Sequence, residues 1–188
     1  IYIGATTSRD VPKIMAIASQ GSSLYIYEIS PEMIQGKKGT ICSGYWELTP
    51  ETGLVEGKLP VATSAYFDRM FYYAVGNKIY RADLTRSTPR SYEIYAHPDP
   101  SVRITRLKFR SQREDRWDIS GGDEVEAIPY DFVSYLGGVA EYPDGNCSML
   151  EMKLTAAGEI DKEEGTKDLM VYEFKGFKNV VDFVYAFK

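Results

Sequence analysis

The sequence predicts an all-β protein organised as part of a β-propeller, with about three four-stranded antiparallel blades. The main observation is a repeat. The strand–turn–strand pattern of residues 21–29 recurs at 76–84, 55 residues later and without a gap, and a looser third copy spans 143–154. Self-similarity at roughly 50 residues is typical of stacked or radial β repeats, and it fits propeller blades better than immunoglobulin-type spacing.

A second observation is the low helical potential of the chain. No segment carries a 3.6-residue amphipathic run longer than two turns, whereas short runs of strand-forming residues alternate with turn residues along the whole length. A chain of 188 residues can bury one substantial core. We therefore expect a single all-β repeat domain over residues 1–188.

The first third of the chain predicts one hairpin and several short strands. The apolar residues 14–18, a break at 19–22 and the alternating run 24–29 form the hairpin. The stretch that follows is rich in Gly, Pro and charge, and it predicts short strands at 40–42, 45–48 and 59–63, the last of them limited by Pro60 to an edge or a strand start.

The middle of the chain predicts a second hairpin. Residues 70–75 form a continuous apolar strand, and Gly76 and Asn77 supply a two-residue turn in which both are expected to adopt positive φ. Further strands follow at 78–84, 91–96 and 102–109. The last of these alternates between a buried and an exposed face, with a break in phase near Arg106.

The last third predicts a long insertion and then more strands. Residues 111–131 are polar and irregular, and loops of this length in compact domains are usually functional or mobile. Strands are expected at 135–141, 147–154, 169–174 and 180–187, separated by turns at 143–146 and 175–177 and by a charged loop at 161–167.

Charge and hydropathy exclude two classes of function. The net charge is −5 and the sequence has no basic stripe, so the electrostatic footprint of a nucleic-acid-binding protein is missing. No apolar run approaches the roughly 20 residues of a membrane-spanning helix. Aromatic residues are abundant, with 15 Tyr, 8 Phe and 2 Trp, and they indicate either packing within sheets or an aromatic binding face.

Three segments resemble a known family. Residues 69–80 resemble a blade hairpin of the PKD-like surface lipoproteins of Bacteroidetes-type bacteria, 104–109 resemble the innermost strand of their next blade, and 174–185 are similar to their closing strand. The resemblance covers roughly residues 69–188 and, weakly, 12–29. These motifs are structural, so they bear on the fold more than on an activity.

The resemblance implies a location and partners. Such proteins carry a lipidated N-terminal cysteine, immunoglobulin-like modules and a C-terminal β-propeller. They accompany a TonB-dependent (SusC/SusD-like) outer-membrane importer and its lid lipoprotein, so the resemblance implies a surface accessory role in nutrient uptake, on the extracellular face of the outer membrane. This chain begins at Ile1 and has material for about three blades, whereas a propeller typically needs 4–8. We therefore expect a C-terminal portion of a longer propeller, without the lipid-bearing cysteine.

The sequence offers little support for catalysis, a metal or a cofactor. His97 is the only histidine, and its place in a His-Pro-Asp-Pro turn after a strand favours a structural role over a catalytic one. One imidazole cannot form a histidine metal cluster. The acidic stretch of Asp123, Glu124 and Glu126 lacks EF-hand spacing, and a solvated loop is expected there rather than a calcium site. We expect no cofactor.

The two cysteines leave the redox state open. Cys42 and Cys147 are too far apart in sequence for any known zinc-ligand spacing. Free buried thiols and a single disulfide, which would suit an oxidising compartment, both fit the sequence.

Contact with a partner or ligand is expected at Trp117 with its neighbours Arg116 and Asp118, in the charged insertion, because Trp and Arg dominate binding hot spots. The alternative for Trp117 is that it plugs the insertion against the sheet. Trp46 is a second candidate, but its neighbours indicate a strand and hence packing.

Three functions remain open from the sequence. The first is a non-catalytic accessory lipoprotein that binds the importer or captures a peptide or glycan. The second is a glycan-active hydrolase on a propeller scaffold, since an acidic protein offers many carboxylate pairs. The third is a structural or adhesive β module.

Overall fold

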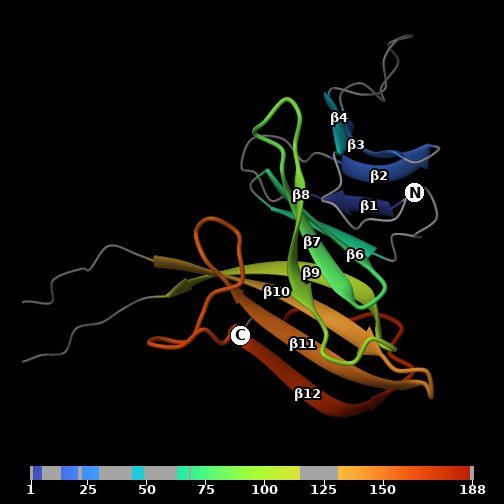
Figure 1. Cartoon of the computed structure of the whole chain (residues 1–188), viewed down its shortest axis with the longest axis vertical. Helices are drawn as coiled ribbons and strands as arrows, with labels where there is room; N and C mark the ends of the chain where they lie inside the picture. The colour runs from blue at the N-terminus through green and yellow to red at the C-terminus, as the bar shows by residue number, and fades with distance from the viewer. Residues whose placement is uncertain are drawn as a thin grey trace, which may run out of the picture.

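The computed structural model describes residues 2–5, 14–20, 23–29, 44–48, 63–67, 69–114 and 131–186. Within these ranges the protein is all-β and contains no helix. Twelve strands form three separate four-stranded antiparallel sheets, and the second sheet lies between the other two (Figure 1). The predicted all-β class and the number of four-stranded sheets are confirmed.

Each sheet is a meander whose four strands follow chain order. The first sheet contains β1 (Tyr2–Ala5), β2 (Ile14–Gln20), β3 (Ser23–Ile29) and β4 (Gly44–Leu48). The second contains β5 (Thr63–Phe67), β6 (Met70–Val75), β7 (Lys78–Asp83) and β8 (Ser91–Ala96). The third contains β9 (Arg103–Glu114), β10 (Asp131–Glu141), β11 (Asn146–Leu154) and β12 (Val171–Lys178).

The predicted repeat is confirmed. The three hairpins expected from the sequence are β2–β3, β6–β7 and β10–β11, and they form the two central strands of the first, second and third sheets respectively. The strands predicted at 45–48 and 91–96 are β4 and β8. Of the strand predicted at 59–63, only Thr63 belongs to the described residues, and it is the first residue of β5. The strand predicted at 40–42 lies outside the described residues.

The core has two parts, one on each face of the second sheet. Between the first and second sheets, Met15, Ile26 and Leu48 pack against Phe71 and Tyr73. Between the second and third sheets, the buried side chains are Ala65, Tyr72, Ala74, Ile79, Val102, Ile104, Leu107, Leu136, Ala140, Leu150, Met152, Leu154 and Ile160. The continuous apolar run of β6 is explained by this arrangement, because a strand covered on both faces has no exposed side to alternate with.

A β-bulge accounts for the phase break predicted near Arg106. Val139 of β10 pairs with Arg106, and the next residue, Ala140, pairs with Ile104, so Thr105 is the extra residue on β9. On either side of the bulge, Ile104 and Leu107 face the core, and Arg106 faces the opposite side of the sheet.

Two predictions for the last third are wrong. The insertion does not begin at residue 111, because β9 continues to Glu114, which pairs with Asp131 of β10; residues 115–130 lie outside the described residues. The expected turn at 175–177 lies inside β12. There Lys175 and Gly176 together oppose a single residue of β11, and Gly176 has φ 102°, so the glycine marks a bulge instead of a turn.

The predicted terminal strand at 180–187 is also absent from the described residues, which end at 186. Residues 181–186 instead lie against the outer face of the third sheet without forming a strand. Arg106 Nε donates to the Val181 carbonyl oxygen at 2.7 Å, and Lys108 Nζ lies 2.8 Å from a carboxylate oxygen of Asp182. The cationic face of β9 is thus covered by the segment that follows β12.

The β6–β7 turn is partly as predicted. Gly76 has φ 58°, but Asn77 does not adopt positive φ, which is the pattern of a turn with glycine at its first central position. The turn is held in place from both sides. Ile104 N–H donates to the Gly76 carbonyl oxygen at 2.8 Å, and Asn77 Nδ2 donates to the His97 carbonyl oxygen at 2.9 Å.

Gly76→Val is expected to lower the free energy of unfolding by about 1 kcal/mol or more, because a β-branched residue is strained at positive φ. No atom lies within 4 Å of a Cβ built at this position, so the loss would come from the backbone alone. Denaturant unfolding measures it, with Gly76→Asn as the control, since Asn tolerates this conformation. Equal stability of all three proteins would contradict the strained-turn explanation.

Candidate functional site

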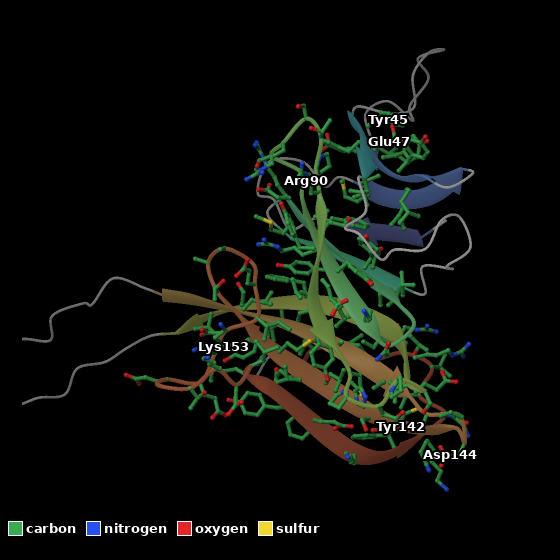
Figure 2. The ribbon with its side chains drawn as sticks, in the orientation of Figure 1. Tyr45, Glu47, Arg90, Tyr142, Asp144 and Lys153 are labelled. Atoms are coloured by element: carbon green, nitrogen blue, oxygen red, sulfur yellow. The ribbon has the colours of Figure 1, made fainter. Side chains whose placement is uncertain are left out.

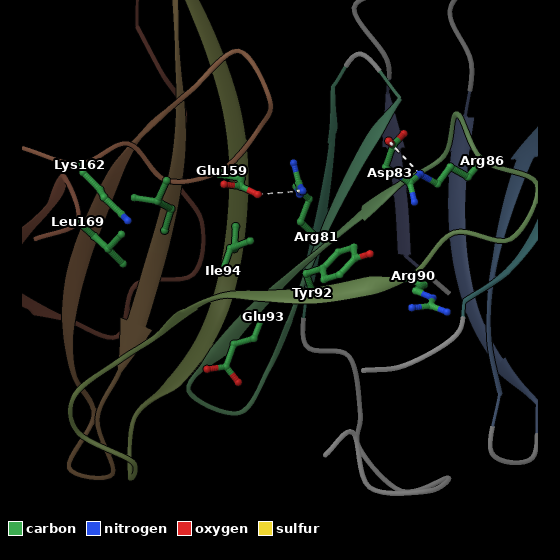
Figure 3. Close-up of a pocket in the computed structure, with 11 residues that line it drawn as sticks. Arg81, Asp83, Arg86, Arg90, Tyr92, Glu93, Ile94, Glu159, Lys162 and Leu169 are labelled. Atoms are coloured by element: carbon green, nitrogen blue, oxygen red, sulfur yellow. Dashed lines mark hydrogen bonds and ion pairs between the residues drawn. The ribbon is translucent and has the colours of Figure 1, made fainter. Parts of the chain in front are cut away.

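A pocket of about 420 Å³ lies between β7 and β8 of the second sheet and the segment that follows β11 (Figure 3). Its lining comes from β7, the β7–β8 connection, β8 and the segment between β11 and β12. The lining residues are Arg81, Asp83, Arg86, Arg90, Tyr92, Glu93, Ile94, Glu159, Ile160, Lys162 and Leu169.

Arg81 joins the two sides of the pocket. It projects from β7, and only 12% of its side chain is exposed. Its Nη1 donates to the Ala157 carbonyl oxygen, and its Nη2 lies 3.3 Å from a carboxylate oxygen of Glu159. A guanidinium that bonds a carbonyl and a carboxylate at once fixes both partners in direction as well as distance.

Tyr72 also binds the segment between β11 and β12 that Arg81 contacts. Its side chain is buried, and its hydroxyl donates to the Gly158 carbonyl oxygen at 2.8 Å. Burial raises the pKa of Tyr72, so the hydroxyl keeps its proton and remains a donor. Gly158 has φ 76°, and a Cβ there would lie 2.6 Å from the Tyr72 hydroxyl oxygen. Only glycine therefore fits where the segment crosses Tyr72.

Each carboxylate of the lining has its own partner. Glu159 pairs with Arg81, and Glu93 lies 2.6 Å from Lys78 Nζ. Asp83 accepts hydrogen bonds from the backbone N–H and the hydroxyl of Thr85, at 2.9 and 2.6 Å. Partial burial alone would raise the pKa of Asp83, but these hydrogen bonds and the nearby arginines hold it below its usual range.

His97 lies outside the pocket, directly after β8. Its ring is buried and meets the rings of Tyr95 and Tyr142 edge to face. Its Nδ1 accepts a hydrogen bond from the Asp99 N–H at 3.1 Å, and its Nε2 lies 3.7 Å from a carboxylate oxygen of Glu173. The histidine thus closes the turn at the end of β8 and packs this turn against the third sheet.

Glu173 is the polar centre of this contact. Burial alone would raise its pKa, but hydrogen bonds and nearby cations hold the pKa below its usual range. One of these bonds comes from the Tyr142 hydroxyl at 2.9 Å. Burial raises the pKa of the neighbouring Tyr95 to about 12. The cluster therefore joins the second and third sheets through a carboxylate that stays ionised at neutral pH.

The structure places only some of the candidate residues from the sequence. Trp46 is half-buried on β4 and packs against the core between the first and second sheets, which agrees with the packing alternative. Arg116, Trp117 and Asp118 lie outside the described residues, so their contact role stays a prediction.

Of the two cysteines and the acidic stretch, the structure describes only Cys147. Cys147 is a buried free thiol, whereas Cys42 lies outside the described residues. The acidic stretch at 123–126 lies outside them as well. Among the residues that the structure describes, no group of three or more His, Cys, Asp and Glu side chains is placed to hold a metal ion.

The pocket was not predicted from the sequence. One side comes from residues 81–94 of the second sheet, and the other comes from residues 159–169, in the connection between β11 and β12 of the third sheet. The only sequence signal was the charged loop at 161–167, and nothing in its composition points to the second sheet.

Comparisons with known proteins leave the chain without an assigned family. No protein-family model matches it, and neither a curated protein nor a solved structure is significantly similar to it. In the described part of the chain, no helix is long and apolar enough to cross a membrane.

Tyr72→Phe is expected to lower the free energy of unfolding by about 1–2 kcal/mol, because the Gly158 carbonyl oxygen loses a buried donor. Denaturant unfolding measures the loss. The control is Tyr92→Phe, which removes a hydroxyl from a side chain that is 38% exposed and should change stability little. Equal effects of the two substitutions would show that the Tyr72 hydroxyl does not support the pocket.

Proposed function

We propose that this chain is part of a β-propeller in a non-catalytic accessory lipoprotein of the outer-membrane surface, which binds a TonB-dependent importer and captures a peptide or glycan. The observation that carries the binding role is the pocket between the second sheet and the β11–β12 connection. Arg81 and Tyr72 hold this connection in place through the carbonyl oxygens of residues 157 and 158. The importer role rests on the resemblance of residues 69–188 to PKD-like lipoproteins.

The contacts between the first strands of neighbouring sheets support the propeller. β1 contacts β5, and β5 contacts β9, so the first strand of each sheet lies beside the first strand of the next. The Leu107 N–H of β9, for example, donates to the Thr63 hydroxyl of β5 at 3.1 Å. Blades arranged around a central channel place their first strands next to one another in this way.

The segment after β12 lies beside the first strand of the third sheet, as the first strand of a further sheet would. The chain passes from β4 to β5 and from β8 to β9, each time from the last strand of one sheet to the first strand of the next. After β12 it returns to β9, where Val181 and Asp182 meet Arg106 and Lys108. Residues 181–186 thus lie where the first strand of a fourth blade would begin.

Exposed aromatic side chains on the outer faces of the first and third sheets are also compatible with additional blades packed against these faces. On the outer face of the first sheet, Tyr25 and Tyr45 stack with ring centroids 5.3 Å apart, and Tyr45 is 55% exposed (Figure 2). On the third sheet, Tyr172 and Phe174 of β12 are exposed. Contiguous exposed apolar surface often marks a site of contact with another part of a protein or with a partner.

The pocket favours binding over hydrolysis. A glycosidase needs a carboxylic acid and a second carboxylate free to act on the substrate. Asp83, Glu93 and Glu159 are instead each held by a hydrogen bond or an ion pair to another side chain. The hydrolase alternative therefore gains no specific support.

Purification of the tagged full-length protein from detergent-solubilised membranes of its native host tests the importer role. We expect mass spectrometry to identify a TonB-dependent transporter and its lid lipoprotein. Trp117→Ala should weaken this association about tenfold, as expected for loss of a central indole, and leave the melting temperature nearly unchanged. Trp46→Ala, at a half-buried packing position, should lower the melting temperature instead.

Two results would contradict the proposal. Absence of any transporter from the purified material would rule out the importer role. A sharp fall in the melting temperature of Trp117→Ala, with the association intact, would show that Trp117 packs within the fold and that the partner surface lies elsewhere.

A further inference from the structure

The pocket has more cationic groups than its carboxylates engage. Four cationic and three anionic side chains line it. Arg81 Nη2 lies 3.3 Å from a carboxylate oxygen of Glu159, and Arg86 Nε lies 4.0 Å from a carboxylate oxygen of Asp83. Within the described part of the chain, the guanidinium of Arg90 and the ammonium of Lys162 have neither a hydrogen bond nor an ion pair.

This positive character is local. The chain as a whole carries a net charge of −5, so the excess of cations is a property of the pocket and not of the surface in general. Glu93 does not reduce it, because Glu93 pairs with Lys78, which is outside the lining. An anionic group of a ligand would give Arg90 the bidentate partner that a guanidinium favours.

An aromatic side chain lies between the two free cations. In Figure 3, Tyr92 projects from β8 between Arg81 and Arg90, and Lys162 lies on the far side of Arg81. Tyr92 and Leu169 are each 38% exposed. The Tyr92 ring offers a flat apolar face with a polar tip, a surface on which the C–H face of a sugar ring can pack.

The composition of the lining favours a hydroxyl-rich ligand. Seven of the eleven lining residues are charged, so the pocket offers many hydrogen-bonding groups beside the apolar surface of the other four, Tyr92, Ile94, Ile160 and Leu169. The volume of about 420 Å³ is in the usual range for a small-ligand site.

We propose that this pocket binds an acidic oligosaccharide, with one carboxylate on Arg90, a sugar ring against Tyr92 and a second anionic group toward Lys162. Arg90 precedes β8, and Lys162 lies in the segment between β11 and β12, so the two cations belong to different sides of the pocket and suit a ligand with more than one negative charge. The proposal rests on the ligand-capturing role proposed above and specifies the chemistry of the ligand.

Isothermal titration calorimetry of the full chain tests this proposal with three probes: trigalacturonic acid, a neutral galactose trisaccharide and a tripeptide of glutamate. Trigalacturonic acid should bind at least about tenfold more tightly than either of the others, the difference expected from one charge-assisted contact. Arg90→Ala, Lys162→Ala and Tyr92→Ala should each weaken its binding about tenfold.

The matched control is Arg103→Ala. Arg103 is an exposed arginine on the third sheet that is absent from the pocket lining, so this change should leave binding unaltered. Arg90 and Lys162 are also exposed, and their variants should melt at the temperature of the parent protein.

Three results would overturn the proposal. Equal affinity for the acidic and neutral trisaccharides would remove the role of charge, and tighter binding of triglutamate would assign the pocket to an acidic peptide. Absence of binding by all three probes would refute an acidic sugar site. None of these results bears on the importer role, which the purification experiment tests separately.

Discussion

Burial of the second sheet on both of its faces is the constraint on which the rest of the structure depends. Successive residues of β6 point in opposite directions, yet Phe71, Tyr72, Tyr73 and Ala74 are all buried. Such a strand is stable only with a sheet on each side, since each exposed aromatic would forfeit roughly 1.5–3 kcal/mol of burial. The first and third sheets are therefore required by the side chains of the second.

The pocket is a consequence of the same constraint. Tyr72 reaches the third sheet's side because it belongs to the face of β6 that packs there, and Arg81, its pairing partner on β7, reaches the same segment. Together they hold residues 157–159 over the edge of the second sheet. Lys162 follows this segment, and Arg90 and Tyr92 lie on the opposite side of the pocket, so core packing sets the positions of the two sides.

Local patterns predicted much of the fold. The three hairpins and the phase break near Arg106 each depend on a few neighbouring residues, and both predictions are confirmed. The positive φ predicted for the β6–β7 turn is confirmed at Gly76 and wrong at Asn77. Gly176 was misjudged because positive φ serves a bulge as well as a turn. Residues 181–186 carry a strand pattern but have no strand partner among the described residues. The pocket was missed because it joins segments of two sheets, and a single sequence contains no signal for that contact.

Amide hydrogen–deuterium exchange on the full chain tests the central claim most directly. If two-sided burial of the second sheet holds the three sheets together, the amides of β6 and β7 should exchange most slowly, because local stability is greatest where both faces are covered. Those of β12, whose side chains are largely exposed, should exchange much faster. Exchange in β6 and β7 as fast as in β12 would contradict the account.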